Sequence, residues 1–154
     1  MVDWKRTQER LAAPPAVQQR PAGLGFFVIF TTPEETLAAL REAGALARGL
    51  DARITLLVAR EVPYPLPLSE PPVPVQFTEE RVRALVESSG TGASVQVLLC
   101  RERREVILRA LPPASLLVLG GRKPWWRRGR TRGLAKLLAR DGHKVVFVKE
   151  FPGL

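Results

Sequence analysis

The segment Gly25–Ala47, GFFVIFTTPEETLAALREAGALA, decides the fold that we expect for this chain. Its first part, Phe26 to Phe30, is an uninterrupted apolar run rich in β-formers, which is typical of a strand covered on both faces. Thr32 can then cap a helix, because Pro33 suits the first helical position and Glu35 can return a hydrogen bond to the cap. The positions that follow on one apolar stripe are Leu37, Leu40, Ala43 and Ala47, and Gly49 is a suitable stop. The segment therefore predicts a buried strand followed by an amphipathic helix.

The same alternation continues along the rest of the chain. Four more apolar runs read as buried strands, at 54–58, 95–99, 116–119 and 145–148. The segments between them predict a helix that opens at Thr78 and closes near Gly90, a short helix around Val106 to Ala110, and a last helix around Leu134 to Leu138. A proline-rich stretch from residue 62 to about 76 cannot pair inside a sheet and predicts a long loop. Strands that alternate with helices in this way indicate parallel βαβ units with right-handed crossovers, hence a doubly wound α/β domain.

Composition limits the organisation and the compartment. With 154 residues and 45% hydrophobic content, the chain can bury one core but not two ordinary ones. We expect a disordered tail over 1–23, a single domain over 24–150 and a short tail over 151–154. The single cysteine excludes an intrachain disulfide, and residues 1–25 contain no apolar core of signal-peptide length. These features favour a cytoplasmic protein.

In an open parallel sheet, ligands bind beyond the carboxyl ends of the strands, where the strand order reverses. In this sequence those ends carry Thr31-Thr32, the proline-rich loop, Cys100-Arg101 and the segment 120–133. The last of these, GGRKPWWRRGRTRG, combines glycines, two tryptophans and many basic residues. We therefore expect a site at the ends of the first and fourth strands.

The five strand and helix units, the turn that runs from the first strand into Thr36-Leu37-Ala38-Ala39-Leu40, and the final Leu-Gly-loop-Gly-helix-strand segment are similar to the universal stress protein family. The resemblance covers roughly Gly25 to Lys149. It implies a five-stranded parallel sheet in the order 3-2-1-4-5, a regulatory role in stress response, and homodimerisation through the last strand. In one branch of the family it also implies ATP binding between strands one and four.

That branch has an Asp at the end of strand one, and after strand four a Gly, two residues, a second Gly, nine residues, a third Gly and a Ser or Thr. Here Thr31 stands in place of the Asp, Lys123 in place of the second Gly and Leu134 in place of the hydroxyl residue, whereas Gly120 and Gly133 match. The motif is incomplete, so ATP stays an open candidate and the cofactor stays unknown. The predicted ligand-binding residues of the cleft are Thr31, Thr32, Gly120, Gly121, Lys123, Arg130, Arg132 and Gly133. Their basic side chains predict a small anionic ligand, a nucleotide or another anion.

Other interpretations stay open beside this one. The net charge of +9 and the basic loop within 120–133 suit non-specific binding of nucleic acid, and the charge also suits an anionic membrane surface, although no nucleic-acid-binding motif is present. The basic loop can equally be a solvated surface, and Trp125-Trp126 a hydrophobic lid over the sheet end. A protein-interaction or scaffolding module with no small ligand is the main alternative function.

The sequence does not favour an enzyme. It has no nucleophile elbow, Walker loop or dinucleotide fingerprint, and no convincing carboxylate pair near the strand ends. His143, in a turn, is expected to be a surface residue. Cys100 is expected to be a small buried hydrophobe, with redox sensing as a lesser alternative because Arg101 and Arg103 could lower its pKa. We therefore expect binding and no catalysis.

Overall fold

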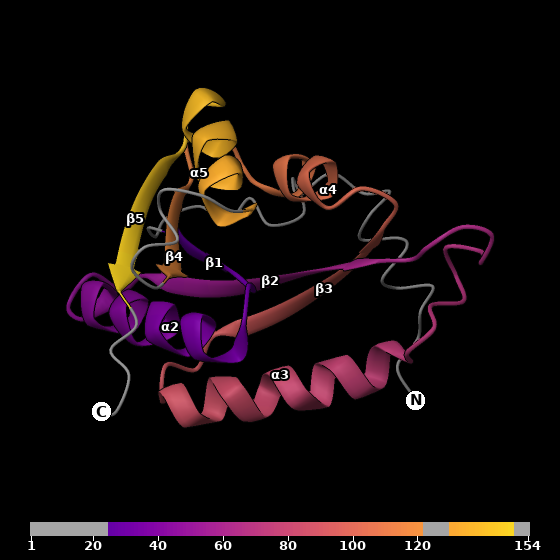
Figure 1. The fold of residues 1–154 in the computed structure, drawn as a ribbon. Helices are drawn as coiled ribbons and strands as arrows, with labels where there is room; N and C mark the ends of the chain where they lie inside the picture. Colours follow the sequence, from indigo (N-terminus) through magenta and orange to yellow (C-terminus); the bar gives the residue numbers. More distant parts are fainter. Residues whose placement is uncertain (1–24, 122–129, 150–154) are drawn as a thin grey trace.

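The computed structural model describes residues 25–121 and 130–149, which form a parallel sheet with helices on both faces (Figure 1). Its elements, in chain order, are β1 (Gly25–Ile29), α2 (Pro33–Ala47), β2 (Arg53–Glu61), α3 (Val75–Ser89), β3 (Ser94–Cys100), α4 (Arg103–Ala110), β4 (Leu116–Gly121), α5 (Arg130–Arg140) and β5 (Lys144–Lys149). The strand order is β3-β2-β1-β4-β5, and every neighbouring pair is parallel. The predicted fold class and strand order are therefore confirmed.

Two apolar cores separate the sheet from its helices. On one face, α2 and α3 bury Leu40 and Val82 against alternate residues of the strands, such as Val28 and Leu56. On the other face, α4 and α5 bury Ile107 and Leu138 against the intervening residues. Because both faces are covered, the central strands are apolar throughout, as the uninterrupted runs in the sequence predicted.

The first helix forms as predicted. Thr32 is the N-cap of α2, and its Oγ1 accepts a hydrogen bond from the backbone N–H of Glu35 at 3.2 Å. Pro33 occupies the first turn, where its missing N–H costs no helical hydrogen bond. Beyond the helix end, Gly49 has φ +76°, a left-handed conformation that glycine adopts without strain.

The start of the second helix was predicted wrongly. The helix α3 begins at Val75 after Pro74, one turn before the predicted start at Thr78. Thr78 lies inside the helix and is buried, because Val75 and Thr78 both face the sheet. Gly90 ends the helix in a left-handed conformation, as predicted.

The expected tails, 1–23 and 151–154, and the tryptophan pair, Trp125-Trp126, lie outside the described residues. No helix within 25–121 and 130–149 has the length and apolarity that crossing a membrane requires.

Candidate functional site

The predicted site lies at the carboxyl edge of the sheet, between β1 and β4. At this point the strand order reverses, because β1 pairs with β2 on one side and with β4 on the other. The crossover helices that start at this edge lie on opposite faces, α2 over one and α5 over the other. In Figure 1 the two helices start on opposite sides of the sheet. This arrangement is the one in which open α/β sheets bind ligands.

Thr31 and Thr32 form the turn between β1 and α2. The backbone N–H of Thr31 donates to Thr36 Oγ1 at 3.1 Å, while the Thr31 hydroxyl oxygen is buried and has no hydrogen-bond partner. Thr32 is committed to its capping role. Thr31 is thus the residue of this pair with hydrogen-bonding capacity left for a ligand.

Gly120 lies directly against the first turn of α2. A Cβ added at this position would stand 2.0 Å from the carbonyl oxygen of Glu35, so only glycine permits the observed approach of β4 and α2. Gly121 ends β4 and pairs with Lys149 of β5. Gly120 and Thr32 are therefore brought to the same turn of α2.

The remaining predicted residues belong to the start of α5 and the loop before it. Arg130 opens the helix, Arg132 is exposed, and Lys123 lies outside the described residues. Gly133 faces α4, since a Cβ added there would stand 2.7 Å from a guanidinium nitrogen of Arg104. Gly120 and Gly133 thus contact helices on opposite faces of the sheet, and each glycine has a packing role in this fold.

One basic residue at this edge was not predicted as part of the site. Arg103, in the first turn of α4, donates from Nη2 to the carbonyl oxygen of Phe30 at 2.6 Å. Phe30 directly follows β1 and precedes Thr31, so a guanidinium group lies at the carboxyl end of the central strand. In the sequence Arg103 follows β3, two strands away from β1, and only the path of α4 across the sheet brings the two together.

Cys100, at the end of β3, is buried, and its thiol lies 3.5 Å from the carbonyl oxygen of Arg60. Burial, assisted by the carboxylates of Glu61 and Glu102, raises the pKa of the Cys100 thiol from 9.0 to about 11. The opposing effect of Arg103 is smaller. The redox alternative was based on a lowered pKa and is therefore wrong: Cys100 is a structural side chain.

His143 is buried, which corrects the expectation of a surface residue. Its Nδ1 accepts the backbone N–H of Ser115 at 3.0 Å. Its Nε2 approaches Asp141 Oδ2 at 3.3 Å. The His143 side chain thus provides the hydrogen-bond acceptor for the backbone N–H of Ser115, just before β4. The sequence does not reveal this role, because Ser115 and His143 lie 28 residues apart, before different strands.

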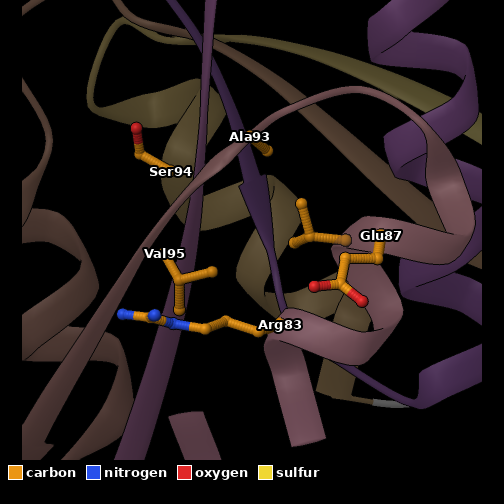
Figure 2. Close-up of a pocket in the computed structure, with 6 residues that line it drawn as sticks. Arg83, Glu87, Ala93, Ser94 and Val95 are labelled. Atoms are coloured by element: carbon orange, nitrogen blue, oxygen red, sulfur yellow. The ribbon is translucent and has the colours of Figure 1, made fainter. Parts of the chain in front are cut away.

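A separate hollow of about 320 Å³ lies between the end of α3 and the start of β3 (Figure 2). Its lining residues are Arg83, Val86, Glu87, Ala93, Ser94 and Val95. Because Ser94 and Val95 begin β3, the hollow lies at the amino edge of the sheet, away from the ends of β1 and β4. It does not belong to the predicted site.

Comparisons with solved structures support the fold. A universal stress protein family member from Burkholderia pseudomallei superposes with a TM-score of 0.56 and 20% identity, over 80% of this chain and 94% of the other. A universal stress protein in complex with cAMP superposes with a TM-score of 0.55 and 15% identity, over 85% of this chain and 100% of the other. No protein-family model and no curated protein sequence matches the chain. The chain therefore has the fold of the universal stress proteins.

Proposed function

We propose that this chain is a ligand-binding regulatory domain of the universal stress type, which holds a small anionic molecule at the carboxyl ends of β1 and β4. The observation that carries the proposal is the Arg103 guanidinium at the end of β1, 2.6 Å from the Phe30 carbonyl oxygen. The residue that follows Phe30, Thr31, has a buried hydroxyl oxygen with no hydrogen-bond partner. A cation and a spare hydroxyl at a topological switch point suit the recognition of a phosphate or carboxylate.

The similar structure that contains cAMP indicates the chemical class of the ligand. In that protein the fold holds a nucleoside with a single phosphate charge. In this chain the Arg103 guanidinium lies at the carboxyl end of β1. We favour an anion with one phosphate group over a triphosphate, because the motif of the ATP branch is incomplete in this sequence.

ATP is a weaker candidate. Gly120 and Gly133 are the two glycines that match the ATP motif, and packing against Glu35 and Arg104 accounts for both. Thr31 stands where the ATP branch has an Asp. The glycines are therefore no evidence of a phosphate nest in this chain.

Within the described part of the chain, His143 and Cys100 are the side chains best suited to catalysis, and their surroundings favour a role in packing. His143 Nδ1 already accepts the backbone N–H of Ser115, and the Cys100 thiol stays protonated at neutral pH because its pKa is about 11. No group of three or more His, Cys, Asp or Glu within 25–121 and 130–149 is arranged to hold a metal ion. We infer a domain that binds its ligand without converting it.

Calorimetry and thermal unfolding with cAMP and with ATP, each at millimolar concentration, test this function. We expect heat and a raised melting temperature with cAMP, and a loss of affinity of about tenfold or more for Arg103→Gln, because one charge-assisted hydrogen bond is removed. Arg103→Lys, which keeps the charge, should recover part of the affinity. Arg41→Gln on α2 is the control with the same change in net charge.

No response to either nucleotide would contradict the nucleotide version of the proposal. Equal affinity of the wild-type protein and Arg103→Gln would contradict the assigned site. The protein-interaction alternative, which needs no small ligand, would then be favoured.

A further inference from the structure

The two helical layers of the molecule carry opposite charge. The helices on one face, α4 and α5, contain seven basic residues and one acidic residue. The helices on the other face, α2 and α3, contain six acidic residues and three basic residues. The positive charge of the folded part of the chain is therefore concentrated on the α4 and α5 side of the sheet, the upper side in Figure 1.

Within this layer α5 presents a regular stripe of cations. Arg132, Lys136 and Arg140 are exposed and follow one another at intervals of four residues, which places them on one side of the helix. Four residues of helix rise about 6 Å, so the charges form a row about 12 Å long. The opposite side of α5 carries Leu134 and Leu138, which are buried in the core.

The helix α4 extends this surface. Its exposed Arg104 lies next to Gly133 of α5, so the first turns of the two helices are in contact. Arg104 and the α5 stripe therefore form one basic face, which we call the α4/α5 face.

The carboxylates that adjoin the α4/α5 face are engaged in local structure. Glu102 caps α4 by accepting the N–H groups of Arg104 and Glu105 at 3.1 and 2.8 Å. Glu105 forms an ion pair with Arg109, one turn further on. Asp141, after α5, lies 3.3 Å from His143 Nε2. Each of these three carboxylates therefore has a partner within its own segment of the chain.

We propose that the α4/α5 face binds the phosphate backbone of nucleic acid without reading its sequence. A row of cations opposite a line of phosphates gains affinity through the release of condensed counterions. Base recognition would need side chains that reach base edges in a groove, and the sequence carries no nucleic-acid-binding motif that would supply them.

An anionic membrane is the competing polyanion, and the face does not suit it. Helices that lie on a bilayer insert large apolar side chains beside their cations. In the part of the chain that the structure describes, the large apolar side chains with high exposure are Leu46, Leu50, Tyr64, Phe77 and Phe147, and none belongs to α4 or α5. Because the α4/α5 face offers positive charge and no exposed large apolar side chain, it suits nucleic acid better than a membrane.

The test is fluorescence anisotropy of a labelled 20-base-pair duplex of arbitrary sequence, titrated with the full chain at 50 and 200 mM salt. Three or four phosphate contacts predict affinity about 40- to 150-fold weaker at the higher salt. The double variant Lys136→Gln/Arg140→Gln should bind more than tenfold more weakly at 50 mM salt. Its slope against log salt should fall by about two units, because two contacts are lost.

The matched control is Arg41→Gln/Arg83→Gln, which makes the same change in net charge on exposed positions of α2 and α3. It should bind like the wild-type protein, within about twofold. Equal losses in both double variants would show that net charge alone attracts the duplex and would overturn the assignment to this face. Circular dichroism should show both variants folded, since all four side chains are exposed.

Vesicles with and without phosphatidylserine complete the experiment. Binding to anionic vesicles with no binding to the duplex would overturn the proposal in favour of a membrane. Arg103→Gln should keep its affinity for the duplex, so the outcome is independent of the small-ligand site proposed above.

Discussion

At the scale of the residue, Gly120 lies in the candidate site and also permits the close packing of β4 against α2. The backbone of β4 passes so close to α2 that the Glu35 carbonyl oxygen takes the space of a side chain. The contact sets the distance between the two elements that border the predicted cleft. A glycine that looks like part of a phosphate-binding motif is thus required first by packing.

We predict that Gly120→Ala destabilises the protein by about 3 kcal/mol, because its Cβ would overlap backbone atoms that cannot move independently of the helix. Urea unfolding measures the change. Gly25→Ala is the control, since its Cβ would meet no atom closer than 3.7 Å, and it should change stability by less than about 0.5 kcal/mol. Similar values for the two variants would contradict the packing argument.

Cys100 provides a second prediction at this scale. Because burial raises its pKa from 9.0 to about 11, the folded state holds the thiol proton more tightly than the unfolded state. This contribution to stability is fully present below pH 9 and is lost as the pH rises from 9 to 11. Between these values the free energy of unfolding of the wild-type protein should fall more steeply with pH than that of Cys100→Ala.

Alkylation gives an independent measurement. Iodoacetamide should modify Cys100 slowly at pH 8 in the native protein and rapidly in urea, where the thiol is exposed and has its ordinary pKa. Rapid modification of the native protein at pH 8 would contradict the structural role of Cys100.

At the scale of the element, the proline-rich crossover between β2 and α3 is held by one side chain. Arg101 donates from Nη1 to the carbonyl oxygens of Val62 and Leu66, each at 2.9 Å, and its guanidinium lies 4.2 Å from the centre of the Tyr64 ring. Val62 also donates its N–H to Cys100 at 2.8 Å, which continues the pairing of β2 with β3. A loop with few internal hydrogen bonds is thereby fixed to the end of β3.

We predict that Arg101→Ala frees this loop and lowers stability by about 2 kcal/mol, because two charge-assisted hydrogen bonds are lost. Limited proteolysis should then cut within residues 62–74 at a protease concentration that leaves the wild-type protein intact. Arg48→Ala, at the exposed end of α2, is the control. Unchanged cleavage in Arg101→Ala would contradict the anchoring role.

At the scale of the whole molecule, the sheet has two edge strands, β3 and β5, at its opposite ends. On β5, Phe147 is 49% exposed, and its neighbours Val145, Val146 and Val148 are only partly buried. An apolar edge strand of this kind is suited to pairing with a second chain. Homodimerisation through the last strand, which the family resemblance implied, stays a prediction.

We predict that the protein sediments as a dimer and that Phe147→Asp shifts it toward the monomer by at least tenfold in dissociation constant, since a charge would be placed in an apolar interface. Analytical ultracentrifugation measures the shift. Phe77→Asp on α3 is the control, because Phe77 has a similar exposure of 51% and belongs to a helix that packs on β3, at the opposite end of the sheet from β5. A wild-type monomer, or an equal effect of the two variants, would contradict dimerisation through β5.

The site was predicted less completely than the fold. Thr31, Thr32 and Gly120 meet at one turn, as expected from the rule that carboxyl ends of parallel strands share an edge. Arg103 and the burial of His143 were missed, because each depends on a contact with a distant segment, Phe30 in one case and Ser115 in the other. Single-sequence patterns report local periodicity, and such contacts leave no local periodic signal.

The sequence by itself determined the alternation of strands and helices, since each apolar run and capping residue acts through neighbours a few positions away. It also determined the parallel sheet, because strands covered on both faces must be apolar throughout. Only the tertiary structure decided that Gly120 serves α2 packing, that Arg103 reaches the end of β1, and that the basic residues collect on the α4/α5 face. Each of these three features depends on contacts between elements that are far apart in the sequence. Which elements meet is decided by the burial of the whole apolar core, and no short stretch of sequence reports it.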